Sequence, residues 1–379
     1  ETFLVKSKSA ALMAEVVRSE GGLLLKSLIP ELMNLAAQGP APAEVAVQTL
    51  RWLPEEITVS GDDMSSDKKR VLLSALLESL PQVLPFLYRV LEQHFASYLA
   101  SSKAASAAEA QLHGTVVAAV LDATFALADW APVVSLMNSG LLHACAHLLT
   151  QPDFALKACE VIKAVSSRKQ ANEDCAAFQQ AMMAVFEVLV GPMKALLESG
   201  YDRLHETELG LRMCETLGIW GHEHIGTLGD GQKLSVYLQE MLAVARHASY
   251  HVSNLTLTFW PAALRALGDR HKAVGRIGRP EGFLAALLEV AAAKIERNPR
   301  WGEGMYPDTE FDTYQEFREF HAIFRHKWME IVKQATQQEP LTAIGVAGRH
   351  VEASLARMAS AESDPSEGAR LDASASLLQ

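Results

Sequence analysis

Apolar residues recur at helical spacing along almost the whole chain, and this pattern constrains the fold more than any single motif does. In the stretch LLHACAHLLT, the leucines and Cys145 fall on one side of a helix, whereas His143 and His147 fall on the other side. Alternating segments typical of strands are hard to find, so we predict an all-α protein. The expected helices cover residues 3–19, 23–38, 42–54, 67–100, 107–130, 137–150, 153–167, 174–198, 202–219, 232–247, 250–268, 282–297, 312–336 and 340–359.

Taken in pairs, these segments give about seven helical hairpins, each close to the roughly 40 to 47 residues of a HEAT or armadillo repeat. Consecutive hairpins with short turns bury their faces against one another, which predicts an α-solenoid, an armadillo-like superhelix with a long concave surface. A compact helical bundle is the alternative, and the run of similar hairpins favours the solenoid. Residues 361–379 are rich in Ser, Asp and Ala, and we expect a flexible tail or linker there.

Charge and cysteine content narrow the class of protein. The net charge of −11 means that any contact with nucleic acid must come from a local basic patch. The four cysteines show no CxxC spacing and lie in apolar helical stretches, as expected for reduced, buried thiols: Cys145, Cys159, Cys175 and Cys214. We find neither a signal peptide nor an apolar run of the roughly 18 to 20 residues that a membrane span needs. We therefore expect an intracellular chain without membrane insertion and, because Glu1 opens inside a helical pattern, a piece of a longer protein.

Two histidine-rich stretches are the candidates for a metal or catalytic site. His143 and His147 share one helical face, but no glutamate follows His143 as in a zincin helix, and no third ligand is indicated. Residues 220–224, WGHEH, match no metal or acid/base motif, and we interpret them as a polar turn. Because no nucleophile or pair of carboxylates stands out either, we expect no enzymatic activity, no metal and no cofactor.

Basic clusters are the candidates for contact with a charged partner. The first opens a long helix after Asp67, its expected N-cap, where cations oppose the helix dipole unless acidic neighbours or an anionic partner stabilise them. The second closes a helix and complements its dipole, and the third lies in the loop GDRHKAVGRIGRP, the best candidate for phosphate contact. These clusters comprise Lys68, Lys69 and Arg70, then Arg168 and Lys169, then Arg270, Lys272, Arg276 and Arg279.

Several stretches between about residue 2 and residue 360 resemble segments of one known protein family, and they occur in the same order along the chain. They include SAALMAEVVRSEG, TLRWLPEEITV, GDDMSSDKKR, LLESLPQVLPFLYRVLEQHF, LTFWPAALR and DTEFDTYQEFREF. Together they resemble the exportin-5 family of nuclear export receptors, particularly its plant-type members. The most specific pieces, RWLPEEITV and the stretch from DWAPVVSL to SSRK, resemble the exportin-1-like domain of the importin-β superfamily.

The resemblance implies a HEAT-repeat transport receptor, with exportin-1-like repeats over residues 1–170 and further repeats over 171–360. It implies binding of Ran-GTP and cargo in the nucleus, contact with nuclear pore proteins, and shuttling between nucleus and cytoplasm. The implied cargo is hairpin or double-stranded RNA, notably microRNA precursors and in some lineages tRNA, whose A-form shape is read through phosphates and 2′-hydroxyls. The basic clusters are then candidate RNA or Ran contacts. The alternative is an α-solenoid scaffold for proteins, such as a microRNA-processing assembly, without RNA contact.

Overall fold

The computed structural model describes residues 2–58, 64–170, 174–200, 208–229, 231–268, 277–295 and 305–360. As predicted, these residues are helical almost throughout, and the described part adds only a short 3-10 helix and one pair of two-residue strands. The chain divides into two compact units, Glu1–Pro192 and Met193–Gln379.

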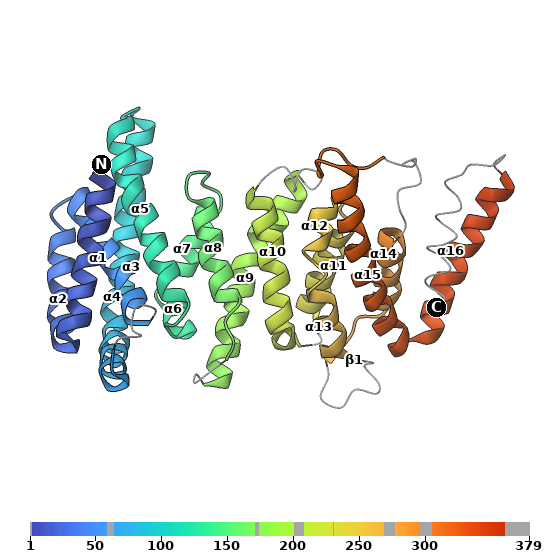
Figure 1. Cartoon of the computed structure of the whole chain (residues 1–379), viewed down its shortest axis with the longest axis horizontal. Coiled ribbons are helices and arrows are strands. Elements are labelled where there is room, and N and C mark those ends of the chain that lie inside the picture. The colour runs from blue at the N-terminus through green and yellow to red at the C-terminus, as the bar shows by residue number, and fades with distance from the viewer. Residues whose placement is uncertain are drawn as a thin grey trace. The chain divides into compact units, whose positions relative to one another are not determined.

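The N-terminal unit is built from two layers of stacked helices. Helices α1, α3, α5 and α8 pack side by side in one layer, and α2, α4 and α7 follow one another in the second (Figure 1). Each helix thus packs against near neighbours in the sequence, as repeat proteins do. The helices are α1 (Thr2–Glu20), α2 (Gly22–Ala36), α3 (Pro40–Thr58), α4 (Ser66–Lys103), α5 (Ala107–Ala128), α6 (Val133–Asn138), α7 (Leu141–Leu148), α8 (Ala155–Ser166) and α9 (Cys175–Gly200), inside which the boundary between the units falls.

The helix expected over 137–150 is in fact α7, which begins only at Leu141. The short helix α6, most of which lies before residue 137, was not expected, and Gly140 separates it from α7. Gly140 has φ 82°, in the left-handed region that glycine adopts without strain, and a Cβ there would lie 3.1 Å from the ring of Tyr88. The expected faces of α7 are confirmed, because Cys145 is buried with its leucines while His143 and His147 are exposed.

The C-terminal unit repeats this arrangement. Helix α10 packs on α13 and α13 on α15, while α11 packs on α14 and α14 on α16. The helix expected over 250–268 is wrong as one element, because turns at residues 255–258 divide it and a short strand ends it. The elements are α10 (Glu208–His224), η3 (Ile225–Leu228), α11 (Gln232–Arg246), α12 (Tyr250–Asn254), α13 (Phe259–Ala266), β1 (Leu267–Gly268), β2 (Ile277–Gly278), α14 (Phe283–Ile295), α15 (Tyr314–Gln338) and α16 (Pro340–Ser360).

The stretch WGHEH does not form the polar turn that we expected. It is the last part of α10, in which Trp220, Gly221 and His224 are buried. The buried hydroxyl of Tyr237, from α11, packs against Gly221 and donates a hydrogen bond of 2.7 Å to the carbonyl of Leu217. An aromatic side chain therefore occupies the space that a larger residue at position 221 would need.

The expectation that no segment suits a membrane span is also wrong. Helices α4, α5 and residues Cys175–Ala195 of α9 are long and apolar enough to cross a membrane, by length and composition only. Packing inside the chain buries between 39% and 50% of each of their most apolar windows.

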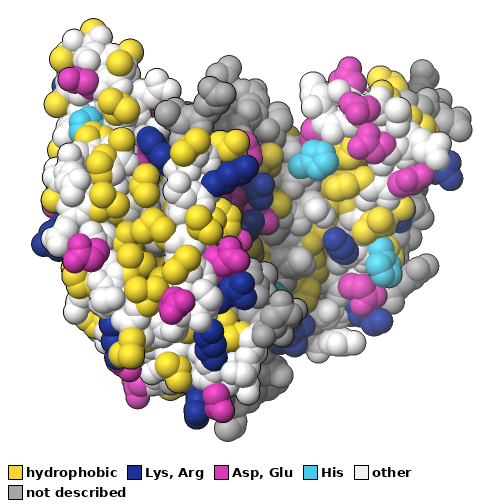
Figure 2. Space-filling model, turned by 60° about the vertical axis from the view of Figure 1, so that its left-hand side comes forward, with side chains coloured by type: hydrophobic (Ala, Val, Ile, Leu, Met, Phe, Trp, Pro, Cys, Tyr) yellow, Lys and Arg dark blue, Asp and Glu magenta, His cyan; other side chains and the backbone are white. Residues whose placement is uncertain are grey.

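Helix α1 carries apolar side chains on two opposite sides. Ala10, Ala14 and Val17 are buried, whereas Val5 and Leu12 are 63% and 60% exposed. Figure 2 brings this end of the N-terminal unit forward and shows hydrophobic side chains interspersed with charged ones. Apolar residues on both sides are typical of a helix that packs on two sides.

Candidate nucleic-acid interface

The first basic cluster lies in the first turn of α4, and partners within the chain hold part of it. The N-cap is Ser65 rather than Asp67, since the Ser65 hydroxyl accepts a hydrogen bond of 3.4 Å from the backbone N–H of Lys68. The Lys68 ammonium donates to the carbonyl of Ser19 at the end of α1, at 2.6 Å. Arg70 pairs with Asp67 at 3.1 Å, and both side chains are largely exposed. These contacts explain how cations are tolerated where they oppose the helix dipole.

The second cluster follows α8. The Arg168 guanidinium donates to the carbonyls of Ala128 and Ala131, at 2.6 and 2.9 Å, and thus satisfies carbonyl groups at the end of α5. Arg168 therefore stabilises the C-terminal end of α5, although it lies just after the end of α8 in the sequence. Lys169, the next residue, is exposed.

The third cluster is only partly described. Arg270, Lys272 and Arg276 lie outside the described residues. Arg279 is 8% exposed, forms an ion pair with Glu339 and donates to the Gln338 side-chain oxygen at 2.9 Å. Its charge is therefore balanced at the junction of α15 and α16, and its role there is structural.

The two ends of that loop are held together by backbone. Strands β1 and β2 pair in parallel, with Leu267 opposite Ile277 and Gly268 opposite Gly278. The backbone N–H of Arg279 donates to the carbonyl of Gly268 at 3.1 Å. These bonds thus fix the two ends of the basic loop between α13 and α14. Strands of two residues are too short to be recognised from the sequence pattern, so this pairing was not expected.

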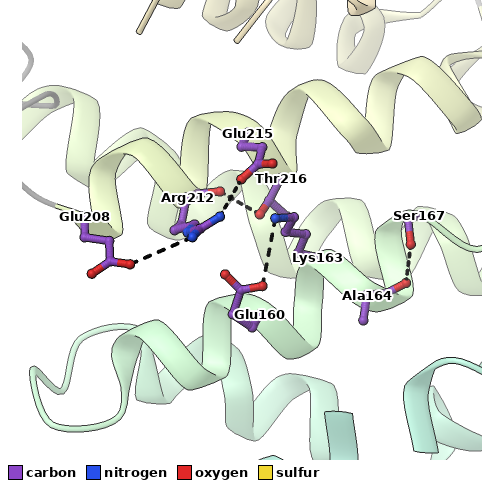
Figure 3. Close-up of polar contacts among 8 residues, drawn as sticks. All are labelled: Glu160, Lys163, Ala164, Ser167, Glu208, Arg212, Glu215 and Thr216. Atoms are coloured by element: carbon purple, nitrogen blue, oxygen red, sulfur yellow. Dashed lines mark hydrogen bonds and ion pairs between the residues drawn. The ribbon is translucent and has the colours of Figure 1, made fainter. Parts of the chain in front are cut away.

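Several other cations pair with carboxylates on their own helices, as Figure 3 shows for α8 and α10. Lys163 lies 3.9 Å from Glu160 on α8. On α10, Arg212 lies between Glu208 and Glu215, at 3.9 and 3.2 Å. Such pairs stabilise a helix by only about 0.3 to 0.5 kcal/mol, but they reduce the local positive potential.

A basic face on α15 escaped the sequence reasoning. Its members line a hollow of about 340 Å³, and they are Tyr314, Phe317, Arg318, His321, Ala322 and Arg325. The arginines and the histidine stand at spacings of three and four residues, which place them on one side of a helix. That spacing is the signal that could have identified them.

The described residues contain no group of three or more His, Cys, Asp or Glu side chains placed to hold a metal ion. His94 and His113 lie close together, with 2.8 Å between their Nδ1 atoms, and burial, then the neighbouring His113, lowers the pKa of His94. Of the cysteines, Cys175 is exposed, contrary to expectation, and the other three are buried. Burial raises the pKa of the Cys145 thiol to about 12, so this thiol is protonated at neutral pH.

Lys294 gives the C-terminal unit a predictable dependence on pH. Burial lowers the pKa of Lys294 to about 8, although the charge of Glu310 opposes this shift. An unfolded lysine has a pKa near 10.5, so between pH 8 and 10.5 the unfolded chain binds more protons and the folded state gains stability as the pH rises. We expect wild type to gain stability relative to Lys294→Met over this window, measured by urea unfolding. The control is Lys333→Met, because Lys333 is exposed and the stability of this variant relative to wild type should not change over this window. If the difference in unfolding free energy between wild type and Lys294→Met stayed constant with pH, the prediction would be contradicted.

Comparisons with known proteins agree on one family. Residues 3–162 match the family model described as Exportin 1-like protein, and residues 205–373 match that of the Exportin-5 family. Protein HASTY 1 of Arabidopsis thaliana is 38% identical over 280 residues, which are 72% of this chain and 23% of that protein. Exportin-5 of Dictyostelium discoideum is 20% identical over 353 residues, 89% of this chain and 30% of that protein. The chain thus spans less than a third of either relative.

A solved structure of importin-13 in its cytosolic state matches 98% of this chain and 43% of its own, with a TM-score of 0.71 and 13% sequence identity. At this identity the likeness shows the fold alone. It confirms the predicted all-α solenoid fold class.

Proposed function

Because this chain belongs to the exportin-5 family of the importin-β superfamily, we propose that it is a segment of a Ran-GTP-dependent nuclear export receptor. The cargo is structured RNA, a microRNA precursor or a tRNA, carried through the nuclear pore. The observation that supports this best is the succession of an exportin-1-like match and an Exportin-5 match along one chain.

The proposed partners are Ran-GTP, hairpin RNA and nuclear pore proteins, and the proposed location is nucleus and cytoplasm, between which the receptor shuttles. No catalytic step is part of this function. Membership of a family of transport receptors supports these assignments in general, and the cargo is the more specific part of the proposal.

The contacts of the basic clusters refine the candidate residues. The side chains of Lys68, Arg168 and Arg279 bond to carbonyl or carboxylate groups of the chain itself. We therefore assign phosphate contact first to the loop whose ends β1 and β2 hold. The loop candidates are Arg270, Lys272 and Arg276. Lys69, Arg70 and Lys169 stay secondary candidates for RNA or Ran contact, although Arg70 also pairs with Asp67, at positions where both side chains are largely exposed.

Reversing the loop charges tests the RNA part of the proposal. We expect Arg270→Glu/Lys272→Glu/Arg276→Glu to weaken binding of a labelled RNA hairpin at least tenfold in the presence of Ran-GTP. Each phosphate contact contributes about 0.7 to 0.9 to the slope of log affinity against log salt, so the slope should fall by about 2 to 3. Fluorescence anisotropy over a salt series measures both quantities.

A charge-matched control is Lys26→Glu/Lys157→Glu/Lys333→Glu, whose lysines pair with carboxylates at exposed positions. This variant should retain affinity within about threefold, since exposed pairs contribute little. Equal loss in both variants would mean that only net charge matters. RNA binding that is the same with Ran-GTP and with Ran-GDP would refute the dependence on Ran-GTP.

The alternative function, a protein scaffold without RNA contact, is supported by the number of basic side chains that are bonded within the chain. If the loop variant kept its RNA affinity but lost a protein partner, the scaffold would be favoured.

A further inference from the structure

A hollow lies between α4 and α7 in the N-terminal unit, on the side of α7 that carries its exposed histidines. Its volume of about 370 Å³ falls within the range of roughly 300 to 1,000 Å³ that is typical of ligand sites. We call it the α4–α7 hollow, and the residues that line it are Tyr88, Leu91, Glu92 and Phe95 of α4, and Gly140, His143, Ala144, His147 and Leu148 of α7.

Aromatic rings contribute much of this lining. The rings of Phe95 and His147 meet edge to face, with centroids 6.0 Å apart and planes at 83°. Tyr88 lies against Gly140, whose missing side chain leaves room for the tyrosine ring. Both Tyr88 and Phe95 are only half-buried, so part of each ring remains open to a ligand. The faces of such rings attract cations, because they carry the negative part of the ring quadrupole.

The charge of the hollow also favours a cation. Among the described residues that line it, Glu92 is the only one of the types Asp, Glu, Lys and Arg. Its side chain is exposed, and within the described part of the chain it forms neither an ion pair nor a hydrogen bond. Arg89, three residues earlier, neither lines the hollow nor pairs with Glu92. An unpaired carboxylate beside aromatic rings repels phosphate and attracts a positively charged group.

An arginine side chain fits this combination best. A planar guanidinium stacks on aromatic rings and pairs with a carboxylate through two parallel hydrogen bonds, whereas a lysine ammonium is a more strongly hydrated point charge. A metal ion does not fit, because no three His, Cys, Asp or Glu side chains of the described residues are placed to hold one.

A second hollow next to the first favours an arginine that belongs to a peptide segment. His143 lines both hollows, and the second one, of about 340 Å³, lies on the α6 and α9 side of α7. Most of its other lining residues are apolar, and they are Val134, Met137, Ala177, Ala181 and Ala184, with Asn138 and Gln180. One segment can therefore place a cationic side chain in the first hollow and an apolar side chain in the second.

We propose that the α4–α7 hollow binds an arginine side chain of a partner protein, on a segment whose apolar residues fill the neighbouring hollow. Glu92 pairs with the guanidinium, and the rings of Tyr88, Phe95 and His147 surround it. None of these residues is among those proposed for contact with RNA or Ran, so this inference does not rest on the proposed function.

The test measures binding of a short fluorescein-labelled peptide to the full chain by fluorescence anisotropy. The peptide carries one arginine flanked by leucines in a glycine-serine background. We expect Glu92→Gln to weaken binding about tenfold, because a charge-assisted pair is lost. Glu31→Gln removes the same charge from an exposed position on α2 and should change affinity by less than about twofold. Replacing the peptide arginine by glutamine should weaken binding as Glu92→Gln does, and the two changes together should cost no more than either alone.

A steric pair of variants tests the hollow itself. Ala144→Leu fills the hollow and should weaken peptide binding at least about fivefold, because the guanidinium can no longer enter. Ala146→Leu makes the same change on the same helix at a position that does not line the hollow, and should have little effect. Circular dichroism checks that each variant is folded.

A reversal of charge separates direct contact from a structural role of Glu92. Glu92→Lys should prefer a peptide with glutamate in place of arginine, which a merely structural role would not produce. Strictly additive losses in Glu92→Gln and the glutamine peptide, or equal losses in Ala144→Leu and Ala146→Leu, would overturn the inference. If Glu92→Gln tightened binding of a labelled RNA hairpin and this RNA displaced the peptide, the occupant would be RNA and the choice of a protein segment would be wrong.

Discussion

Replacing Gly221 by alanine is expected to destabilise the C-terminal unit by about 3 kcal/mol, the upper end of the range for overpacking a core. The added Cβ would overlap the hydroxyl of Tyr237 and lie 2.7 Å from a ring carbon of Phe259. Neither ring has room to move, because both side chains are fully buried and pack edge to face with centroids 5.5 Å apart. Thermal unfolding followed by circular dichroism measures the loss.

Two further variants separate this clash from a general intolerance of alanine. Gly226→Ala in η3 places its Cβ where no atom lies within 4 Å, so it should change stability by less than about 0.5 kcal/mol. Tyr237→Phe removes the overlapping hydroxyl and should recover part of the loss when combined with Gly221→Ala. Strict additivity of the two substitutions would refute the clash, since residues in contact are expected to couple.

Truncating Trp328 to alanine is expected to cost about 3 to 5 kcal/mol, the usual penalty for a large cavity in a core. Trp328 is 0% exposed and contacts Phe324 on the buried side of α15, with 6.3 Å between ring centroids. The cost should be measured by urea unfolding, in which the midpoint changes while the slope does not.

Ile323 on the same helix is the matched control for Trp328. Its side chain is 60% exposed, so Ile323→Ala should cost less than about 0.5 kcal/mol. A loss for Trp328→Ala no larger than that of Ile323→Ala would show that α15 does not contribute to a shared core.

Helical periodicity predicts most of the fold, because the side that a helix buries is repeated in its sequence. It locates α1 to α5 within a few residues and fails where a break depends on a distant partner. Gly140 is required by the ring of Tyr88, and Gly221 by Tyr237. Neither partner is visible from the local pattern, so the start of α7 was placed four residues too early, α6 was missed and the end of α10 was taken for a turn.

The candidate site, too, could be predicted from the sequence only in part. Sequence reveals where basic residues cluster, but the groups that bond to Lys68, Arg168 and Arg279 lie 37 to 60 residues away in the chain. The sequence alone could therefore not show which of these cations bond to groups of the chain itself. The basic side of α15 was predictable from its spacing and was missed because its residues do not form a contiguous run.

The pairing of Gly268 with Gly278 has a practical consequence for engineering. Since backbone hydrogen bonds join the ends of residues 269–276, extra residues inserted between them need not displace α13 or α14. Each doubling of a loop's length costs only about 0.6 kcal/mol of closure entropy. This position is therefore suited to a short peptide tag or a fluorophore attachment site that leaves the packing of α13 and α14 unchanged.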